Sequence, residues 1–557
     1  MEKVEKKKTN SFMKNVLMLM TAQVVIKFLG FLYRMVIINI EGFGDTGNGY
    51  YATGYQIYCL LLTLSSVGIP TVISKLVSER VAIGDNKGAH KLFKTAFKVF
   101  TTIGLITGIG LFFSAEAIAK YIISVEDVKY TLMVLAPAIA FVPASAVLRG
   151  YFSGLGTMKP TSVTQTLEQF LNCLLTITFV YATVGKDTAI MAAAGNLSST
   201  VSIIIAFMYI ALYYRKQRKG ILEECNNQTI KTEEKTTKQI LKIIFAISIP
   251  MTIASLVAEL NGTIDAITIS NCIQKAFAVE LQGVKVALEA KAMELSGVVS
   301  KVDTIVRLPL AINAAFSTAL VPAISASIAK KEMNLASKRL SFSFFATIII
   351  ILPCAIGLSV LAEPILKTMY PTSYQGAGVL ALTTISMTFV SLSYVVNGGL
   401  HGMGKVYIPI VGLIVGGIIK ATLNIILISN PKINIYGSPI SSAACQIVNF
   451  IICSSYLRKY VKLDITFKKN ILKPLFSALV MGMVAYGTHY LLLGLLGNAI
   501  STIIAIITGA VTYGIMIVIT KTLNKDEFFM VPFGSKIYKV LLKLKIYKEE
   551  GEKVLWS

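Results

Sequence analysis

The segment VLMLMTAQVVIKFLGFLYRMVIINI (residues 16–40) is the first apolar run of the chain, and it carries two basic residues, Lys27 and Arg34. They are seven residues apart, which is close to two turns of an α-helix, so both point to the same side. A charge near the centre of a bilayer costs roughly 2.5–3.5 kcal/mol on insertion scales. A membrane helix with two such charges on one face is expected to turn that face toward water or an anionic ligand.

The composition is that of a membrane protein. Hydrophobic residues make up 54% of the 557 residues, charged residues make up 15%, and the mean hydropathy is +0.69. The net charge is +24, but the basic residues lie between apolar runs rather than on one face, so nucleic-acid binding is not indicated. The first apolar run is too long for a signal-peptide core and lacks a small-residue cleavage site, which predicts an uncleaved first span.

Apolar runs long enough to cross about 30 Å of hydrocarbon recur along the chain. They predict an all-α polytopic membrane protein with about fourteen transmembrane helices. Lys- and Arg-rich segments alternate with segments poor in both, such as 41–49 and 430–438. The positive-inside rule then places both termini in the cytoplasm. The predicted spans are 15–40, 50–78, 93–114, 128–150, 160–183, 188–213, 240–270, 297–329, 339–362, 377–401, 405–429, 436–457, 472–494 and 498–520.

The two halves of the chain resemble each other. LRGYFSGLGTMKPT (148–161) follows the fourth span and VNGGLHGMGKVYIP (396–409) follows the tenth, with three glycines at the same spacing; Pro70 and Pro322 form a weaker second match. Six spans separate the copies, so the repeat is parallel and predicts two pseudo-symmetric six-helix lobes plus two C-terminal helices.

This repeat divides the chain into six parts, of which the last is either an amphipathic helix on the inner membrane surface or a solubilising extension. The predicted parts are a cytoplasmic tail (1–14), a first lobe (15–213), a cytoplasmic linker (214–239), a second lobe (240–457), the last two spans with their preceding loop (458–520) and a basic cytoplasmic tail (521–557).

Motifs for enzyme chemistry are missing from the sequence. It contains no Walker A loop, nucleophile elbow, metal triad or pair of catalytic carboxylates, and the glycine-rich GGLHGMG (398–404) falls at a helix–helix junction. The seven cysteines form no C-x-x-C motif, and the three histidines are far apart. We therefore predict no enzyme activity, cofactor or metal, which leaves transport.

Ionisable residues within the spans are the candidate site. Lys27 lies near the middle of its span. Arg34 lies nearer the outer edge, where snorkelling to the headgroups is the alternative. Arginine offers a planar fork for two phosphate oxygens, which lysine lacks.

The eighth span adds Lys301, Asp303 and Arg307. Asp303 and Arg307 are at i,i+4, so they either neutralise each other or line a cavity in which Arg307 exchanges its partner for a ligand anion.

Other charged or polar residues are candidates with a second interpretation. Glu259, Asn261 and Asp265 of the seventh span either bind a coupling cation or act as structural counter-charges. Lys75 and Arg80 at the cytoplasmic rim either anchor helix ends or attract an anionic headgroup from inside. The weaker candidates are Lys94 and Arg149 at the same rim, and Glu168, Gln169 and Lys420 within spans.

Four segments carry a resemblance to a known family. KFLGFLYR (27–34), GIPTVISKLVSERVAIGDNKGAHKLFKTAF (68–97), RGYFSGLGTMKPT (149–161) and VDTIVRLPLA (302–311) are similar to the polysaccharide flippase branch of the MOP exporter superfamily, and most similar to its lipid II flippase (MurJ) and stage V sporulation (SpoVB) groups. The resemblance implies a V-shaped, two-lobed transporter with a cationic central cavity, and a lipid-tail groove formed by the last two spans.

The resemblance also aligns individual residues. Lys27 matches the inner basic position of the first helix, and Arg34 falls one residue beyond the second basic position. Asp303 matches an acidic position, whereas Thr304 stands where many relatives have a basic residue; Arg307, one turn on, is a substitute.

The predicted function is a bacterial plasma-membrane flippase that moves undecaprenyl-diphosphate-linked peptidoglycan precursor to the outer leaflet by alternating access, for cell-wall or spore-cortex synthesis. The predicted partners are this lipid-linked diphosphate-glycan, membrane lipids and wall-synthesis or sporulation proteins. The alternatives are a flippase for another polyprenyl-linked polysaccharide, a multidrug/cation antiporter and a non-transporting scaffold of a wall-building complex.

Overall fold

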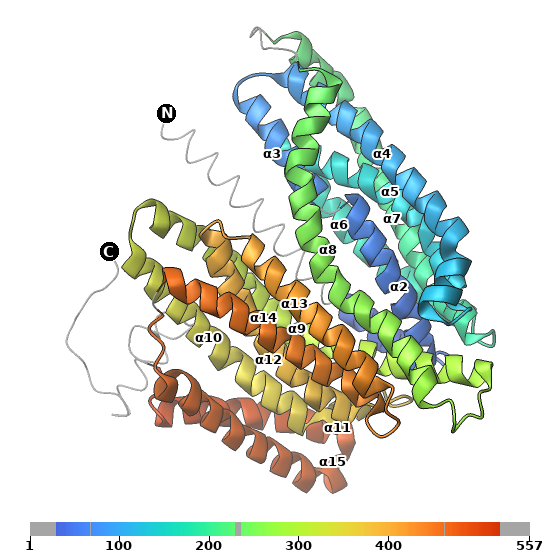
Figure 1. The fold of residues 1–557 in the computed structure, drawn as a ribbon, viewed down its shortest axis with the longest axis vertical. Coiled ribbons are helices and arrows are strands. Elements are labelled where there is room, and N and C mark those ends of the chain that lie inside the picture. The colour runs from blue at the N-terminus through green and yellow to red at the C-terminus, as the bar shows by residue number, and fades with distance from the viewer. Residues whose placement is uncertain (1–28, 67, 229–234, 462, 524–557) are drawn as a thin grey trace. The chain divides into compact units, whose positions relative to one another are not determined.

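The computed structural model describes residues 29–66, 68–228, 235–461 and 463–523, and every secondary-structure element in these ranges is helical (Figure 1). The all-α prediction is therefore confirmed for this part of the chain. After the short helix Leu29–Ile38, the longer elements are α2 (Gly44–Ser66), α3 (Ile69–Ala82), α4 (Asn86–Ala117), α5 (Val128–Gly154), α6 (Lys159–Ala182), α7 (Thr188–Asn226), α8 (Thr237–Ala276), α9 (Lys285–Ala329), α10 (Met333–Val360), α12 (Ala377–Gly402), α13 (Tyr407–Ile428), α14 (Gly437–Tyr460) and α15 (Lys473–Ile519). The short elements are η1 (Ile118–Ile123), α11 (Ala362–Met369), η2 (Asn434–Tyr436) and η3 (Lys468–Leu472).

Ten helical segments of the described chain are long and apolar enough to cross a membrane, so this is a multi-pass membrane protein. The count is lower than fourteen for identifiable reasons. The first predicted span is described only from Leu29 on, and the last two fall in one segment, Lys468–Ile519. Helix α6 is at a predicted position but is more polar, with Glu168, Gln169 and Asn172 close together. Helix α9 is at the position of the eighth predicted span, and several of its side chains lie outside the described part of the chain.

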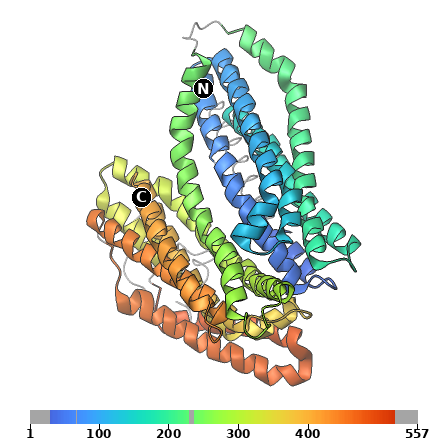
Figure 2. The ribbon, with the colours of Figure 1, turned by 45° about the vertical axis from the view of Figure 1, so that its right-hand side comes forward.

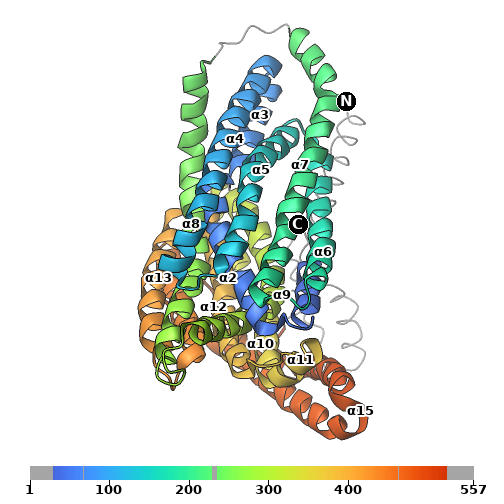
Figure 3. The same ribbon diagram turned by 90° about the vertical axis from the view of Figure 1, so that its right-hand side faces the viewer.

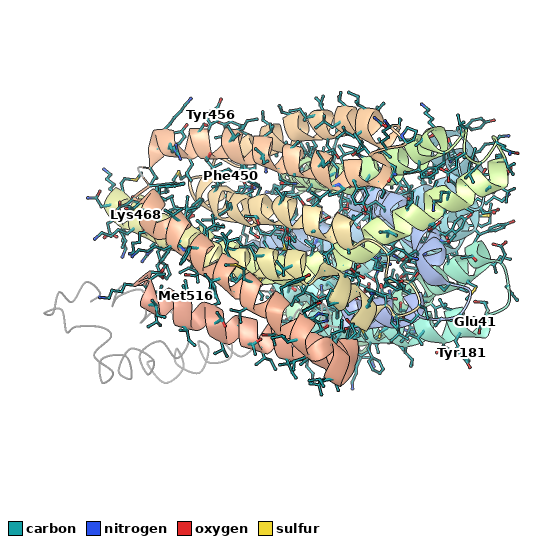
Figure 4. The ribbon with its side chains drawn as sticks, turned by 90° about the horizontal axis from the view of Figure 1, so that it is seen from below. Glu41, Tyr181, Phe450, Tyr456, Lys468 and Met516 are labelled. Atoms are coloured by element: carbon teal, nitrogen blue, oxygen red, sulfur yellow. The ribbon has the colours of Figure 1, made fainter. Side chains whose placement is uncertain are left out.

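The last segment is a hairpin rather than one rod. Gly497 (φ 72°, ψ 172°) interrupts the helical backbone of α15, and positive φ of this kind favours glycine. The chain doubles back there (Figure 2), and Lys473 Nζ donates to the Lys521 carbonyl at 3.1 Å. Lys468 and Met516 accordingly lie toward the same end (Figure 4). The two arms correspond to the predicted segments 472–494 and 498–520.

The chain forms two compact units. Unit 1 comprises the described residues up to Ile305 together with Gly417–Ser441, and unit 2 comprises Val306–Gly416 and the described residues from Ser442 on. In unit 1, α5 packs against α2, α3, α4 and α7 (Figure 3), and a buried apolar cluster joins α3, α4, α5, α7 and α8. In unit 2, α10 packs against α12 and α15. The predicted six-helix lobes stay a prediction, because unit 1 also takes in α8 and part of α9.

Apolar side chains also cover much of the outside. Phe113 in α4 is 80% exposed and Leu491 in α15 is 75% exposed. Exposed apolar surface on long helices is what a hydrocarbon solvent requires, whereas a water-soluble protein rarely tolerates it in such amounts.

Two segments that were predicted to lie between the spans are helical over part of their length. Helix α2 begins at Gly44, inside the predicted external segment 41–49. The predicted linker 214–239 is helical as far as Asn226, and α8 begins after a capping box in which Thr236 and Gln239 bond each other's backbone.

The glycines of the repeat have a packing role in each unit. In unit 1, a β-carbon on Gly150 would lie 2.7 Å from the Pro70 carbonyl oxygen of α3, and one on Gly154 would lie 2.8 Å from that of Ser74. In unit 2, a β-carbon on Gly402 would lie 2.8 Å from Cβ of Ile324 in α9. These distances are too short for a side chain, so glycine lets α5 and α12 approach their neighbours.

The third glycine of each motif ends the helix. Gly156 (φ 78°) and Gly404 (φ 73°) have left-handed backbone conformations. The amide that follows donates to the carbonyl five residues back, at 3.0 Å in the first motif and 2.8 Å in the second. This is the geometry of a glycine-terminated helix, and the two motifs adopt it in the same way.

A polar contact also fixes the end of η1 in unit 1. Three side chains of α8 donate to carbonyls at this end and just after it: Ser270 to Ile123 at 2.6 Å, Asn271 to Ile122 at 2.9 Å and Gln274 to Ser124 at 2.7 Å. The last carbonyls of a helix lack intrahelical partners, so α8 supplies the missing donors.

Candidate functional site

Arg34 is held by neutral groups from two helices. Its Nη1 donates to Ser300 Oγ at 2.9 Å and lies 3.5 Å from Thr304 Oγ1, one turn apart on α9. Its guanidinium also lies 5.3 Å from the centre of the Tyr51 ring of α2. Thr304 stands where the resemblance implied a basic residue, and here its hydroxyl lies beside the Arg34 cation instead of adding a second charge. The hydroxyls position Arg34 without neutralising it.

Lys301, the neighbour of Ser300, has a different environment. It is fully buried, and its Nζ lies 2.6 Å and 2.8 Å from the two carboxylate oxygens of Asp45, which is 5% exposed. Asp45 lies in the first turn of α2. Both charges are enclosed, and such a pair is stable only when each ion keeps its partner. In this conformation the Lys301 ammonium is therefore committed to Asp45 rather than open to a substrate.

Glycines allow α2 and α9 to enclose this pair. A β-carbon on Gly49 would lie 1.9 Å from the Met293 carbonyl oxygen, and one on Gly297 would lie 1.7 Å from that of Asp45. Asn48 Nδ2 also donates to the Gly297 carbonyl at 2.8 Å. The two helices thus meet backbone to backbone, which no larger residue at these positions would permit.

The remaining predicted substrate contacts lie elsewhere. Asp303 is half-buried in unit 1, and Arg307 is exposed in unit 2, so their pairing stays a prediction. Lys75 is exposed and lies 3.9 Å from Glu79. Lys27 lies outside the described residues.

Arg80 anchors a helix start in this structure. Its Nη1 lies 2.5 Å from Oδ2 of Asp85, and Asp85 caps α4 by accepting from the Gly88 amide at 2.9 Å. This contact matches the anchoring interpretation of the sequence analysis, since the guanidinium is committed to a structural carboxylate.

The candidate ion-coupling residues of α8 have partners within the chain. Asp265 Oδ2 accepts from Lys420 Nζ at 2.6 Å, and Oδ1 accepts from Asn424 Nδ2 at 2.9 Å. The same Lys420 ammonium donates to the Asn261 carbonyl at 2.9 Å. The counter-charge interpretation of Asp265 therefore matches this structure, with Lys420 as the ion that it neutralises.

Glu259, which precedes Asp265 on α8, has a neutral partner. Gln56 Nε2 of α2 donates to its Oε2 at 3.2 Å. Its role as an ion-coupling residue stays a prediction.

Sequence reasoning missed Asp45 and Asn48, and it did not pair Lys420 with Asp265. A signal for the first two was present, because EGFGDTGNG (41–49) has glycines at 42, 44, 47 and 49. Such glycines allow close helix packing, but they equally favour a loop, so the sequence alone does not decide between the two. The pairing of Lys420 with Asp265 joins helices far apart in sequence and left no local signal.

A bundle of long apolar helices defines the class of polytopic membrane proteins, and this one holds ion pairs and a cation positioned by neutral groups among its helices. The sequence profile described as "Polysaccharide biosynthesis protein" matches residues 12–328, and that described as "Lipid II flippase MurJ" matches residues 292–510. The first match covers more than half of the chain, which therefore belongs to the polysaccharide biosynthesis protein family.

Curated relatives match along most of the chain. Stage V sporulation protein B of Bacillus subtilis (strain 168) is 25% identical over 536 residues, which cover 95% of this chain and 99% of that protein. The lipid II flippase MurJ of the same organism is 26% identical over 402 residues, which cover 69% of this chain and 72% of that protein. The two identities are nearly equal, so they do not separate the two groups.

Solved structures share the fold. The lipid II flippase MurJ in an inward closed conformation has a TM-score of 0.68 at 16% identity, and covers 94% of this chain and 100% of its own. An inward-facing multidrug resistance MATE family transporter of the MOP superfamily has a TM-score of 0.62 at 14% identity, and covers 77% of this chain and 94% of its own. These two membrane transporters therefore have the same fold as this chain.

Proposed function

We propose that this protein is a flippase for a polyprenyl-diphosphate-linked glycan precursor, with lipid II as the leading substrate. It would span the bacterial plasma membrane about fourteen times, keep both termini in the cytoplasm and work by alternating access. The observation that carries the proposal is Arg34, a partly buried guanidinium that donates to the hydroxyl of Ser300 at 2.9 Å and lies 3.5 Å from that of Thr304.

Charge supplies the reason for this site. A diphosphate headgroup loses hydration as it enters the protein, and a cation already in place offsets part of that loss. Arg34 presents a planar fork that matches two phosphate oxygens, and neutral hydroxyls do not compete for it as a carboxylate would. A transporter of cationic drugs would instead use acidic groups in its cavity, because unlike charges attract.

The relatives support the kind of substrate. The profile named for lipid II flippases covers residues 292–510, which include Ser300 and Thr304. The chain is nearly equally identical to the sporulation protein and to the lipid II flippase. A glycan precursor used only in spore formation is therefore the alternative substrate.

Alternating access would use the buried pair of Asp45 and Lys301. Separation of α2 from α9 would break this pair and leave two charges without partners. The free-energy cost of that loss must be offset by a new contact. An arriving phosphate is such a compensation for Lys301, because it replaces one anionic partner by another. The pair would then act as a latch that opens when substrate charge is present.

The energy would come from the membrane potential, which is worth about 2.3 kcal/mol per elementary charge per 100 mV. An inside-negative potential favours the return of an empty, positively charged site toward the cytoplasm. Flipping that continues at the same rate after the potential is collapsed would contradict this step.

Depletion of this protein, followed by expression of its variants, tests the function in a bacterium that depends on it. Depletion is expected to remove lipid II from the outer face of the membrane, as measured by the accessibility of lipid II to an externally added enzyme. Arg34→Ala and Lys27→Ala should fail to restore it, whereas Arg215→Ala, at an exposed position of α7, should restore it. Unchanged outer-face lipid II after depletion, with no redundant flippase present, would reject the proposal.

A further inference from the structure

A second enclosed guanidinium lies in unit 1, away from Arg34. Arg149 is in α5, and its nearest carboxylate is that of Glu168 in α6, with 3.7 Å between Nη1 and Oε2. This distance is longer than a hydrogen bond. The two side chains are 15% and 33% exposed, so the cation is largely enclosed while its charge is only loosely balanced.

Arg80 in the same unit provides an internal comparison. Its side chain is 14% exposed, nearly the same as that of Arg149, but its Nη1 lies 2.5 Å from the Asp85 carboxylate. Enclosure therefore does not explain the loose pairing of Arg149. A purely structural arginine forms the short contact, and Arg149 does not.

The backbone that carries Arg149 is firmly held. Its carbonyl accepts from Thr161 Oγ1 at 3.3 Å, and the next residue, Gly150, packs directly on α3. Only the guanidinium end is loosely held. A fixed base with a loosely paired head is the arrangement expected of a residue that changes partner.

Polar side chains of α6 continue from this pair along the helix, and Gln169 of the same helix borders the helix of Arg34. Glu168, Asn172 and Thr176 follow each other at one-turn spacing on one face. Asn172 Nδ2 donates to Ser199 Oγ of α7 at 3.0 Å. Gln169, next to Glu168, has its Nε2 3.9 Å from where a β-carbon of Gly30 would lie, and Gly30 is one turn before Arg34.

We propose that Arg149 is a second anion-binding residue, which receives a phosphate of the substrate headgroup by exchanging Glu168 for it. The inference deepens the proposed flippase function and rests on it. A phosphate accepts two parallel hydrogen bonds from a guanidinium, whereas Glu168 makes one long contact. The ligand class is a phosphate or diphosphate ester; a lipid-linked diphosphate and a soluble diphosphate share this chemistry.

Binding to the full-length protein in nanodiscs tests the proposal, with undecaprenyl diphosphate and inorganic pyrophosphate as separate probes. Arg149→Gln is expected to weaken binding of undecaprenyl diphosphate roughly tenfold, the loss of one charge-assisted hydrogen bond. Glu168→Gln is expected to tighten it, because the competing carboxylate is gone. Arg215→Gln, at an exposed position, is the matched control, and thermal unfolding of each variant checks folding.

The two substitutions are expected to change the affinity for undecaprenyl diphosphate in opposite directions, and this difference decides the test. A purely structural pair predicts that both variants lower stability and that neither tightens binding, and this result would overturn the assignment. If Arg34→Gln weakens binding and both Arg149→Gln and Glu168→Gln leave it unchanged, the assignment also fails while the proposed function stands. If the unmodified protein does not bind undecaprenyl diphosphate, the proposed function fails and the assignment falls with it. Equally tight binding of inorganic pyrophosphate, with the same ranking of variants, supports the anion site and identifies a soluble diphosphate as its ligand.

Discussion

At the scale of single residues, neighbouring charges of this protein have different roles because their partners differ. Lys301 and Asp45 neutralise each other in a fully enclosed pair, whereas Arg34 is held by the hydroxyls of Ser300 and Thr304. The first arrangement stabilises one conformation, and the second keeps a charge available for a ligand.

Removal of one charge of the buried Asp45–Lys301 pair should lower the stability of the fold more than removal of both charges. Lys301→Met leaves the Asp45 carboxylate buried without its cation, and we expect a loss of about 3–5 kcal/mol in the free energy of unfolding. The double variant Asp45→Asn, Lys301→Met should recover most of that loss. Denaturant unfolding in detergent measures both, and a double variant as unstable as Lys301→Met would contradict the argument.

At the residue scale, the sequence identifies charged side chains within apolar runs but does not identify their partners. Arg34 and Lys301 stand out as cations within apolar runs. Their partners are set by how α2 and α9 pack, and Asp45 precedes Lys301 by some 250 residues. A lone sequence carries no information on such a contact, so the prediction could name the cations without separating the neutralised one from the other.

At the scale of helices, glycines control how closely α2 and α9 approach. Gly49→Ala would place a methyl group 1.9 Å from the Met293 carbonyl oxygen, so the helices must move apart. We expect a loss of about 1–3 kcal/mol or more. Gly110→Ala in α4, where the added carbon meets nothing within 4 Å, is the matched control and should gain about 0.5–1 kcal/mol. Equal effects of the two substitutions on thermal unfolding would refute the close-packing account.

An ion pair outside the membrane spans gives α9 a pH-dependent contact. Lys285 Nζ lies 2.5 Å from Oε1 of Glu126 in the loop before α5, and its hydrogen bond and charge hold the pKa of Glu126 below its usual 4.5. A carboxyl with a lowered pKa in the folded state adds stability above its unfolded pKa, and this contribution disappears as pH falls through the folded value.

Comparison with Glu126→Gln therefore isolates this contact. The unmodified protein should have the higher melting temperature at pH 7, and the difference should vanish as pH falls below 4.5 through the lowered pKa of Glu126. Glu79→Gln, in a looser exposed pair with Lys75, should show little difference at any pH. A difference between the unmodified protein and Glu126→Gln that stays constant from pH 7 to pH 3 would argue against the ion pair.

Helix positions followed from the sequence better than helix ends. The predicted span 377–401 matches α12 (Ala377–Gly402), because apolar residues and the flanking glycines mark both limits. The start of α2 was predicted six residues late, since glycines in EGFGDTGNG serve helix packing rather than a loop. Composition therefore predicts the length of an apolar helix well, but it does not show whether a glycine serves helix packing or a loop.

At the scale of the whole molecule, the internal repeat and the family were accessible from sequence. The glycine motifs at 150–156 and 398–404 pack and end their helices in the same way in the two units. The substrate was less accessible, because it depends on a few polar contacts within a common fold. Those contacts, rather than the helices, separate a carrier of anionic headgroups from a carrier of cationic drugs.

The most direct test of the central claim is transfer of lipid II between leaflets by the purified protein in proteoliposomes with an imposed membrane potential. We predict that the unmodified protein moves lipid II to the opposite leaflet faster than protein-free vesicles do, and that Arg34→Ala lowers this rate at least tenfold, since one charge-assisted contact is worth about 1.5–3 kcal/mol. The control Arg215→Ala should keep the full rate. Transfer no faster than in protein-free vesicles, or an Arg34→Ala rate equal to that of the unmodified protein, would contradict the account.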